Sequence, residues 1–177
     1  MTADSRRYCP QCRRELISRE LGGRPRLACT VAECGFVFWD NPVPVVAAIV
    51  ELAERVVLVR NAWWPKGKFG LLAGYLEPDE TAEQGILREV MEELGLQGTI
   101  AEFVGTYPNP GNNQLLLVYH VRVEGEPKLS AELAEIRRLA PGQLRPWPYG
   151  TGVALRDWLA QRGHLDHRLS ESSYSPP

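Results

Sequence analysis

All four cysteines of this 177-residue chain lie in its first fifth, at Cys9, Cys12, Cys29 and Cys34. Two residues separate the first pair, four separate the second, and sixteen lie between the pairs. Two close pairs of thiolates suit a tetrahedral zinc ion, and four thiolates leave no open position for a water nucleophile. Because residues 1–41 are too few to build a hydrophobic core, we expect a zinc ribbon that is folded by a structural metal. Disulfides and unrelated free thiols are the alternatives.

The composition narrows the classes of protein to which the chain can belong. With 44% hydrophobic and 24% charged residues, it is typical of a globular protein. No apolar run approaches the ~20 residues of a membrane span, and the N-terminus lacks the apolar stretch of a secretory signal. We therefore expect a cytoplasmic protein without membrane contact, in a compartment where disulfides are rare. The net charge of −2 does not indicate nucleic-acid binding, but it leaves such binding open.

Residues 42–162 predict one larger domain of strands and helices. Two prolines in residues 41–44 predict an extended linker before this domain. Apolar runs predict strands and a 3.6-residue spacing predicts helices. The expected strands are 45–52, 56–60, 69–73, 100–107 and 114–123, and the expected helices are 82–94, 131–138 and 153–162. Residues 163–177 lack core side chains, and we expect a loose tail.

The helix expected at residues 82–94 has clear start and stop signals. Thr81 and Gln84 predict a capping box, in which each side chain satisfies a backbone N–H of the first turn. Gly95 suits the left-handed conformation that often follows the end of a helix. At 100° per residue, one stripe of apolar side chains faces the core, and it consists of Leu87, Val90 and Leu94.

Three carboxylates, Glu89, Glu92 and Glu93, cluster on another face of this helix, roughly 140° from the apolar stripe. Gly85 lies one turn before Glu89, where a missing side chain leaves room for a ligand. Like charges four residues apart repel, and acids near a helix C-terminus oppose its dipole. Three converging carboxylates suit Mg²⁺ or Mn²⁺, which take oxygen ligands and bind substrate phosphates. A solvated acidic face is the alternative, and the spacing alone does not decide between them.

The segment from Gly74 to Leu96 resembles the Nudix box. That motif is a Gly, five residues, Glu, seven residues, Arg-Glu, an aliphatic residue, one residue, Glu-Glu, one residue, Gly and a final aliphatic residue. Every specified position is matched across the 23 residues. A four-cysteine ribbon directly before such a domain is similar to the NADH-pyrophosphatase branch and its zinc-ribbon relatives. The resemblance implies an α/β fold, a mixed β-sheet sandwiched between α-helices, with a small N-terminal zinc ribbon.

The resemblance also implies roles for the charged residues of the box. Nudix enzymes hydrolyse a nucleoside diphosphate linked to another group, with divalent metals neutralising the developing charge. Glu89, Glu92 and Glu93 would bind Mg²⁺ or Mn²⁺ together with the carbonyl of Gly74, and Glu89 or Glu93 could act as the general base. Arg88 would orient these glutamates by ion pairing, and the alternative is an ordinary surface partner of Glu92.

Two further acidic positions follow from the same resemblance. Glu80 would brace the junction between the loop and the helix rather than bind metal. A fourth acidic ligand often comes from a later loop in this family, and Glu135 or Glu132 is the candidate here. Either glutamate could equally be a solvated helix residue.

Residues outside the box would set substrate specificity. Trp63 and Trp64 could stack on a purine, and the alternative is packing in the core or at a homodimer interface. Further candidates for substrate binding are Lys66, Lys68, Tyr75 and Tyr107. His120, His164 and His167 are interpreted as structural. The NADH-pyrophosphatase branch carries a downstream SQPWPFPxS array, and residues 106–113 keep two of its prolines but not its Trp, Phe and Ser.

The expected reaction is therefore hydrolysis of a nucleoside diphosphate derivative of the ADP-ribose, NAD(H) or FAD class, which releases a nucleoside monophosphate. A small-molecule nucleotide is the expected partner. One alternative is a non-catalytic, Nudix-like regulator that senses a ligand or binds RNA. Another is a pyrophosphatase that removes a nucleotide cap from RNA.

Overall fold

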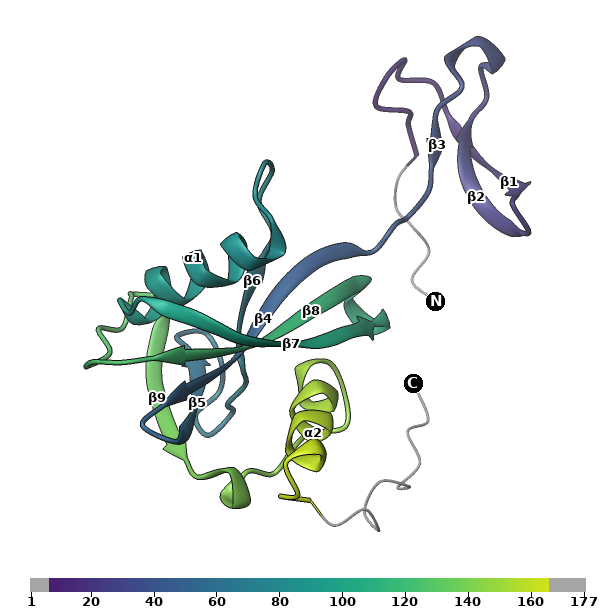
Figure 1. Ribbon diagram of the computed structural model, residues 1–177. Helices are drawn as coiled ribbons and strands as arrows, with labels where there is room; N and C mark the ends of the chain where they lie inside the picture. The colour runs from purple at the N-terminus through teal and green to yellow at the C-terminus, as the bar shows by residue number, and fades with distance from the viewer. Residues whose placement is uncertain (1–6, 166–177) are drawn as a thin grey trace. The chain divides into compact units, whose positions relative to one another are not determined.

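The computed structural model describes residues 7–165, and the chain divides into two compact units, Met1–Asn41 and Pro42–Pro177 (Figure 1). The first unit is a three-stranded antiparallel sheet in the order β1-β2-β3. Its strands are β1 (Leu16–Leu21), β2 (Arg24–Cys29) and β3 (Val37–Phe38), with a short 3₁₀ helix, η1 (Ala32–Cys34), before β3. The few buried side chains of this unit include two of its cysteines, Cys9 and Cys29.

The second unit contains a six-stranded sheet. Along the chain its strands are β4 (Val43–Leu52), β5 (Arg55–Asn61), β6 (Leu72–Tyr75), β7 (Gly98–Asn109), β8 (Gln114–Val123) and β9 (Leu133–Leu139). The strand order is β7-β8-β4-β5-β9, and β6 pairs with the first half of β4 on the side where β5 pairs with its end. The β4–β8 pair is parallel and the others are antiparallel, so the expectation of a mixed sheet is confirmed.

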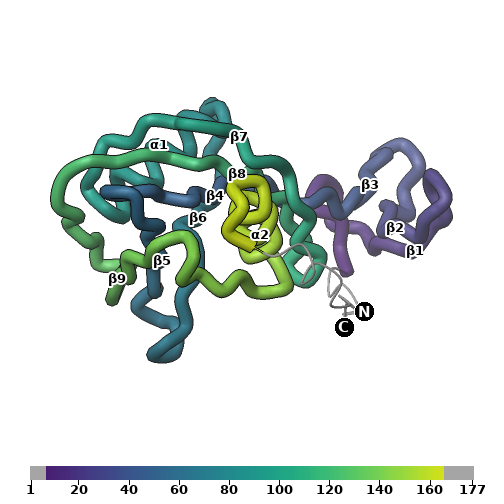
Figure 2. Tube along the Cα trace, turned by 60° about the horizontal axis from the view of Figure 1, so that its bottom comes forward, coloured from purple at the N-terminus to yellow at the C-terminus, as the bar shows by residue number. Residues whose placement is uncertain are grey.

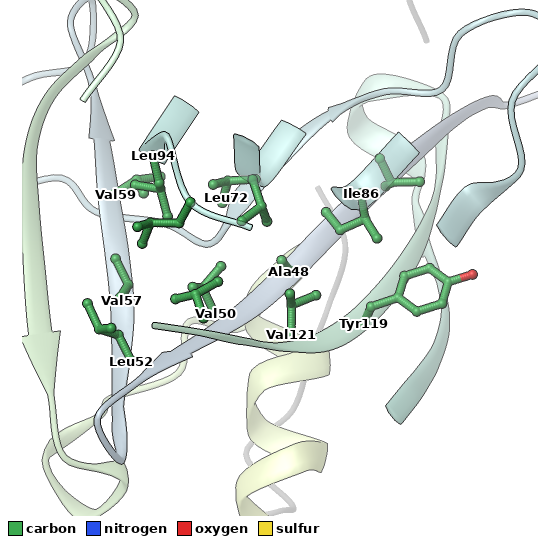
Figure 3. Packing of buried hydrophobic residues seen from close by; sticks show 14 of the residues in the cluster. Ala48, Val50, Leu52, Val57, Val59, Leu72, Ile86, Leu94, Tyr119 and Val121 are labelled. Atoms are coloured by element: carbon green, nitrogen blue, oxygen red, sulfur yellow. The ribbon is translucent and has the colours of Figure 1, made fainter. Parts of the chain in front are cut away.

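Two helices, α1 (Ala82–Leu94) and α2 (Thr151–Gln161), cover opposite faces of this sheet (Figures 1 and 2). Side chains alternate along β4, because successive residues of a strand point to opposite faces. Val46, Ala48 and Val50 belong to the cluster with α1, and Figure 3 shows Ile86 and Leu94 of that helix above the sheet. The alternate residues of β4 belong to the cluster with α2: Val45, Ala47 and Ile49. The predicted α/β sandwich is therefore confirmed.

The helix predicted at residues 131–138 is wrong, because most of this segment forms strand β9. Its sequence, AELAEIRR, is rich in helix formers, and Leu133 and Ile136 have a helical spacing. Strand β9 instead completes the sheet by pairing along β5, with a bulge between Arg60 and Asn61. The hydrogen bonds and packing that this edge of the sheet gains outweigh a local preference of a few tenths of a kcal/mol per residue.

The other predicted elements are present with shifted ends. Strand β4 begins at Val43 and includes Pro44, so part of the expected linker lies in the sheet. The strand predicted at 69–73 is β6, which begins at Leu72, and α2 begins at Thr151 rather than Val153. Of the expected loose tail, residues 166–177 lie outside the described residues. In residues 7–165, neither α1 nor α2 combines the length and the apolar content that crossing a bilayer requires.

Candidate active site

A wide cleft in the second unit brings the acidic face of α1 together with three loops. It is lined by Gly74 of β6 and by four side chains of α1: Arg88, Glu89, Glu92 and Glu93. The loop after β5, the loop before β9 and the loop before α2 also line it, together with residues of β4, β7 and β8. The four metal ligands predicted from the box therefore all line the same cavity.

Helix α1 begins and ends where the signals in the sequence predicted. The hydroxyl of Thr81 accepts a hydrogen bond from the Gln84 N–H at 3.3 Å, and the Gln84 side chain accepts one from the Thr81 N–H at 2.8 Å. Gly95 adopts a φ of 65° and donates its N–H to the Met91 carbonyl. These caps fix the length of the helix and hence the position of its acidic face.

Arg88 ties the acidic face to the loop before the helix. Its Nε and Nη2 donate to both carboxylate oxygens of Glu80 at 3.0 and 2.8 Å, and Nη2 also donates to the Tyr75 carbonyl at 3.1 Å. Its Nη1 donates to Glu89 at 2.8 Å and to Glu92 at 2.9 Å. The hydrogen bonds from Arg88 lower the pKa of Glu80 to about 2. Arg88 is thus more than a surface partner of Glu92, and Glu80 braces the loop.

Glu93 is the most buried carboxylate of the cleft, with 7% of the residue exposed. Its Oε2 has no hydrogen-bond partner within residues 7–165. Burial raises the pKa of Glu93 to about 7, and the nearby charges of Glu89 and Glu132 act in the same direction. Burial also raises the pKa of Glu89, against the lowering effect of Arg88. Because a buried carboxylate without a partner is costly, this arrangement favours a bound cation.

Two glycines make room for carboxylates rather than for a ligand. A Cβ at Gly74 would fall 2.0 Å from Oε1 of Glu89. A Cβ at Gly85 would fall 2.8 Å from Oε1 of Glu80 and 3.0 Å from Cδ1 of Leu76. The prediction that Gly85 leaves space for a ligand is therefore wrong, because that space holds the side chains of the bracing loop.

The structure separates the predicted substrate-binding residues into two groups. Trp63, Trp64, Lys68 and Tyr75 line the cleft. Trp63 is 67% exposed, whereas Trp64 is partly covered and has the Lys68 ammonium 5.5 Å from its ring centroid. Lys66 is exposed outside the residues that line the cleft.

Tyr107 lies with the side chains that pack beside α2 rather than in the cleft. Burial, together with the neighbouring Asp157, raises its pKa to about 12. The structure therefore places Tyr107 outside the residues that line the cleft, and its contact with a substrate stays a prediction.

Of the two candidates for a fourth acidic group, Glu132 is in the cleft. Its charge acts on both Glu89 and Glu93. Glu135 lies on β9, where it pairs with Arg60 at 3.2 Å, and it does not line the cleft. The position of the loop before β9 therefore favours Glu132.

Sequence reasoning missed several residues that line the cleft. Trp147 and Tyr149 come from the loop before α2, and Asn109 and Gln114 come from facing ends of β7 and β8. Asn109 donates to Gln114 at 2.9 Å, and Gln114 donates to the Tyr75 hydroxyl at 3.4 Å. The run of aromatic and proline residues at 146–149 was the available signal, but only the fold brings it beside the box.

The histidines that the structure describes agree with a structural interpretation. His120 is buried on β8, with its Nε2 2.7 Å from Oε2 of Glu51 and its ring 5.2 Å from that of Trp158. His164 is exposed after α2, and its N–H donates to the Leu159 carbonyl. His167 lies outside the described residues.

The four cysteines of the first unit form a second candidate site. Their sulfur atoms all lie within 4.8 Å of one another, with Cys9 and Cys34 3.6 Å apart and Cys12 and Cys29 3.4 Å apart. Gly35, which follows the last cysteine, adopts a φ of 64°, as a tight turn requires. The four-sulfur cluster fits a single tetrahedral metal ion.

Residues 41–160 match the model of the NUDIX domain family. The chain belongs to the Nudix family. Its Nudix unit is similar to the NAD-capped RNA hydrolase NudC of Mycobacterium bovis (strain BCG / Pasteur 1173P2). The two are 33% identical over 117 residues, which are 64% of this chain and 36% of that protein. NudC of Pectobacterium carotovorum subsp. carotovorum (strain PC1) is 26% identical over 121 residues, which are 68% of this chain and 45% of that protein.

The chain therefore spans less than half the length of these curated relatives. A solved structure is similar over almost the whole chain. The NUDIX hydrolase from Nitrosomonas europaea has a TM-score of 0.73 and 28% identity, and the match covers 90% of this chain and 93% of that one. The second unit thus shares the Nudix fold with a protein of nearly the same length as this chain.

Proposed function

We propose that this chain hydrolyses the pyrophosphate bond of a nucleoside diphosphate linked to a second group, and that it releases a nucleoside monophosphate. The observation that carries the proposal is the buried carboxylate of Glu93. One of its oxygens has no hydrogen-bond partner among the described residues, and it lies near Glu89 and Glu132 in the cleft. The free-energy cost of this arrangement is relieved when a cation joins it. Membership of the Nudix family, with every position of the box matched, supports the same reaction.

The donor set of the cleft fits a hard divalent cation. Glu89, Glu92, Glu93 and the carbonyl of Gly74 would hold Mg²⁺ or Mn²⁺, and Glu132 is the further candidate. Carboxylate and carbonyl oxygens are the ligands that these ions prefer. When bound, the metal stabilises the negative charge that develops on the phosphates.

The side chains of this chain supply proton transfer, orientation and substrate contacts. Glu89 or Glu93 accepts the proton of the attacking water. Arg88 holds the carboxylates of Glu89 and Glu92 in place through its two short hydrogen bonds. Lys68, at the rim formed by the loop after β5, attracts the phosphates of the incoming nucleotide.

The aromatic residues of the cleft support a substrate with a ring at each end. Trp63, Trp64, Tyr75 and Tyr149 offer stacking surfaces for a purine or for a second ring system. ADP-ribose, NAD(H) and FAD belong to this class. The names of the curated relatives favour a second candidate, in which the same pyrophosphate bond belongs to an NAD cap at the end of an RNA.

We also propose that Cys9, Cys12, Cys29 and Cys34 hold a structural Zn²⁺, within a ribbon at residues 1–41 that precedes a Nudix domain at 42–162. Four thiolates fill a tetrahedral shell, so this metal takes no part in the hydrolysis. A reducing cytoplasm, where thiols persist and nucleotide substrates are present, suits both sites.

A panel of substrates tests the proposed reaction. NADH, NAD⁺, ADP-ribose, FAD, diadenosine polyphosphates, dNTPs and an NAD-capped RNA are incubated with Mg²⁺ or Mn²⁺, and the released monophosphate is quantified. We expect AMP from at least one of the ADP-linked substrates and slower turnover of dNTPs, which lack a second ring to stack. Absence of metal-dependent turnover across the panel would favour the non-catalytic regulator.

A further inference from the structure

One face of the three-stranded sheet in the first unit combines arginines with apolar side chains. The register pairs Ile17 with Ala28, Arg19 with Arg26 and Leu21 with Arg24. Because alternate residues of a strand share a face, these three pairs lie on the same side of the sheet. Strand β3 adds Val37, which pairs with Ala28, and Trp39 follows it two residues later. We call these positions the arginine face.

The charged residues of the arginine face are all arginines, and the nearest acid on this side of the sheet is Glu15, two residues before Ile17 at its end. Arg19 and Arg26 are directly opposite each other on neighbouring strands, where like charges destabilise a sheet. No ion pair joins either of them, or Arg24, to another residue in the described part of the chain. Glu20 alternates to the other side of the sheet, where it is opposite Pro25. Stability alone therefore does not account for this cluster, and it is complementary to an anionic partner.

An exposed aromatic ring lies within the same cluster. Trp39 is 51% exposed, and Ile17, on the same face, is 38% exposed. The guanidinium carbon of Arg26 is 4.9 Å from the Trp39 ring centroid, and its Nη1 donates to the Trp39 carbonyl. The cation therefore orients the ring and leaves part of its surface open to solvent.

We propose that the arginine face binds single-stranded nucleic acid, with phosphates at Arg19 and Arg24 and an unstacked base on Trp39. Guanidinium groups match phosphates through paired hydrogen bonds, and aromatic rings stack on any base. A duplex keeps its bases stacked on one another, so it cannot use the ring in this way. Six residues of strand extend over ~20 Å, which is enough to follow several nucleotides. The proposal concerns binding and goes beyond the hydrolysis proposed for the cleft.

Fluorescence anisotropy with a labelled single-stranded 15-mer RNA tests this proposal on the full chain. The titration is carried out without added divalent cations and at KCl concentrations from 50 to 200 mM, so that binding is measured apart from turnover. We expect saturable binding that weakens with salt, because phosphate contacts release counterions. An RNA duplex of the same sequence should compete at least tenfold less effectively.

Two variants separate the contributions of charge and stacking. Arg19→Ala/Arg24→Ala should reduce the slope of log K against log[KCl] by about 1.4, since each phosphate contact contributes about 0.7 for single strands. Trp39→Ala should weaken binding by roughly 5- to 150-fold with little change in slope. Arg14→Ala/Arg55→Ala is the matched control, because it removes two exposed arginines that lie outside the arginine face.

Zinc content and a circular dichroism spectrum show whether each variant retains the fold. The proposal is overturned if the wild-type chain does not bind at 50 mM KCl. It is also overturned if the Arg19/Arg24 variant keeps its zinc and shows the same affinity and salt slope as the control. In that event Arg19 and Arg24 do not contact nucleic acid. Loss of hydrolysis in the substrate panel would leave this measurement unaffected.

Discussion

Gly74 lies directly against the carboxylate of Glu89. A Cβ at position 74 would fall 2.0 Å from both Cδ and Oε1 of Glu89, far inside van der Waals contact. The glycine that begins the box is therefore required by a side chain that comes fifteen residues later, on the first helix. Backbone strain is not the reason, since Gly74 does not have a positive φ.

Gly74→Ala should therefore move the Glu89 carboxylate and reduce kcat/KM by at least about 100-fold, which corresponds to ~2.7 kcal/mol of lost transition-state stabilisation. The melting temperature should change little, because the displaced group is the end of a flexible side chain. Gly142→Ala is the control, since a Cβ there meets no atom within 4 Å. Wild-type activity in Gly74→Ala would show that the position of Glu89 does not matter for turnover.

Neutralising the buried carboxylate of Glu93 should lower the activity of the protein without lowering its stability. Glu93→Gln should lower kcat by several orders of magnitude while the free energy of unfolding of the metal-free protein holds or rises, because a like-charge contact disappears. Ile86→Ala, on the buried side of the same helix, should do the opposite and cost about 2–5 kcal/mol of stability. Glu54→Gln, at an exposed turn, should leave both quantities unchanged. Near-normal turnover of Glu93→Gln would contradict the assigned role.

Glu93 should also make the stability of the metal-free protein depend on pH. Burial raises its pKa from 4.5 to about 7, so the folded chain retains a proton that the unfolded chain has already lost between these values. The stability contributed by protonated Glu93 is therefore complete below pH 4.5 and is lost as the pH rises through about 7. We expect the free energy of unfolding to fall by about 2–3 kcal/mol more in the wild type than in Glu93→Gln over this range. Parallel curves from urea titrations would contradict the shift.

The first helix was predictable from the sequence because its signals are local. Thr81, Gln84 and Gly95 act within one turn of the helix ends, and the helical period places the three glutamates on one face. Strand β9 was not predictable in this way. Leu133 and Ile136 suit a helix, and only the open edge of β5, far away in the sequence, makes the segment a strand.

The cleft shows the same division between local and long-range information. The box residues on α1 are close in sequence, and their spacing alone indicated a shared face. Trp147 and Tyr149 are more than 50 residues away from α1, and they reach the cleft because α2 packs on the opposite face of the sheet. No local pattern connects these loops, so the walls of the cleft had to come from the structure.

The two tryptophans of the loop after β5 should respond differently to substitution. Trp63 is 67% exposed, so Trp63→Ala should raise KM for an ADP-linked substrate with little change in kcat or stability. Trp64 is packed closely over Gly70, where a Cβ would fall 3.1 Å from the indole, and its ring faces Lys68. Trp64→Ala should therefore lower the melting temperature. Unchanged kinetics in both Trp63→Ala and Trp64→Ala would return these two tryptophans to a packing role.

The cysteine cluster should bind one zinc ion per chain without added metal. Four sulfur atoms within 4.8 Å of one another are preorganised for one tetrahedral ion, and the first unit has few other buried side chains. Elemental analysis should therefore give about one zinc per chain, with no thiol that reacts rapidly with a disulfide reagent.

Cys29→Ser should release the zinc and expose residues 7–41 to proteolysis. The Nudix unit should keep its melting transition in that variant, because α1, α2 and the six-stranded sheet form cores of their own. A fully folded first unit with four titratable thiols and no zinc would contradict the structural role of the metal.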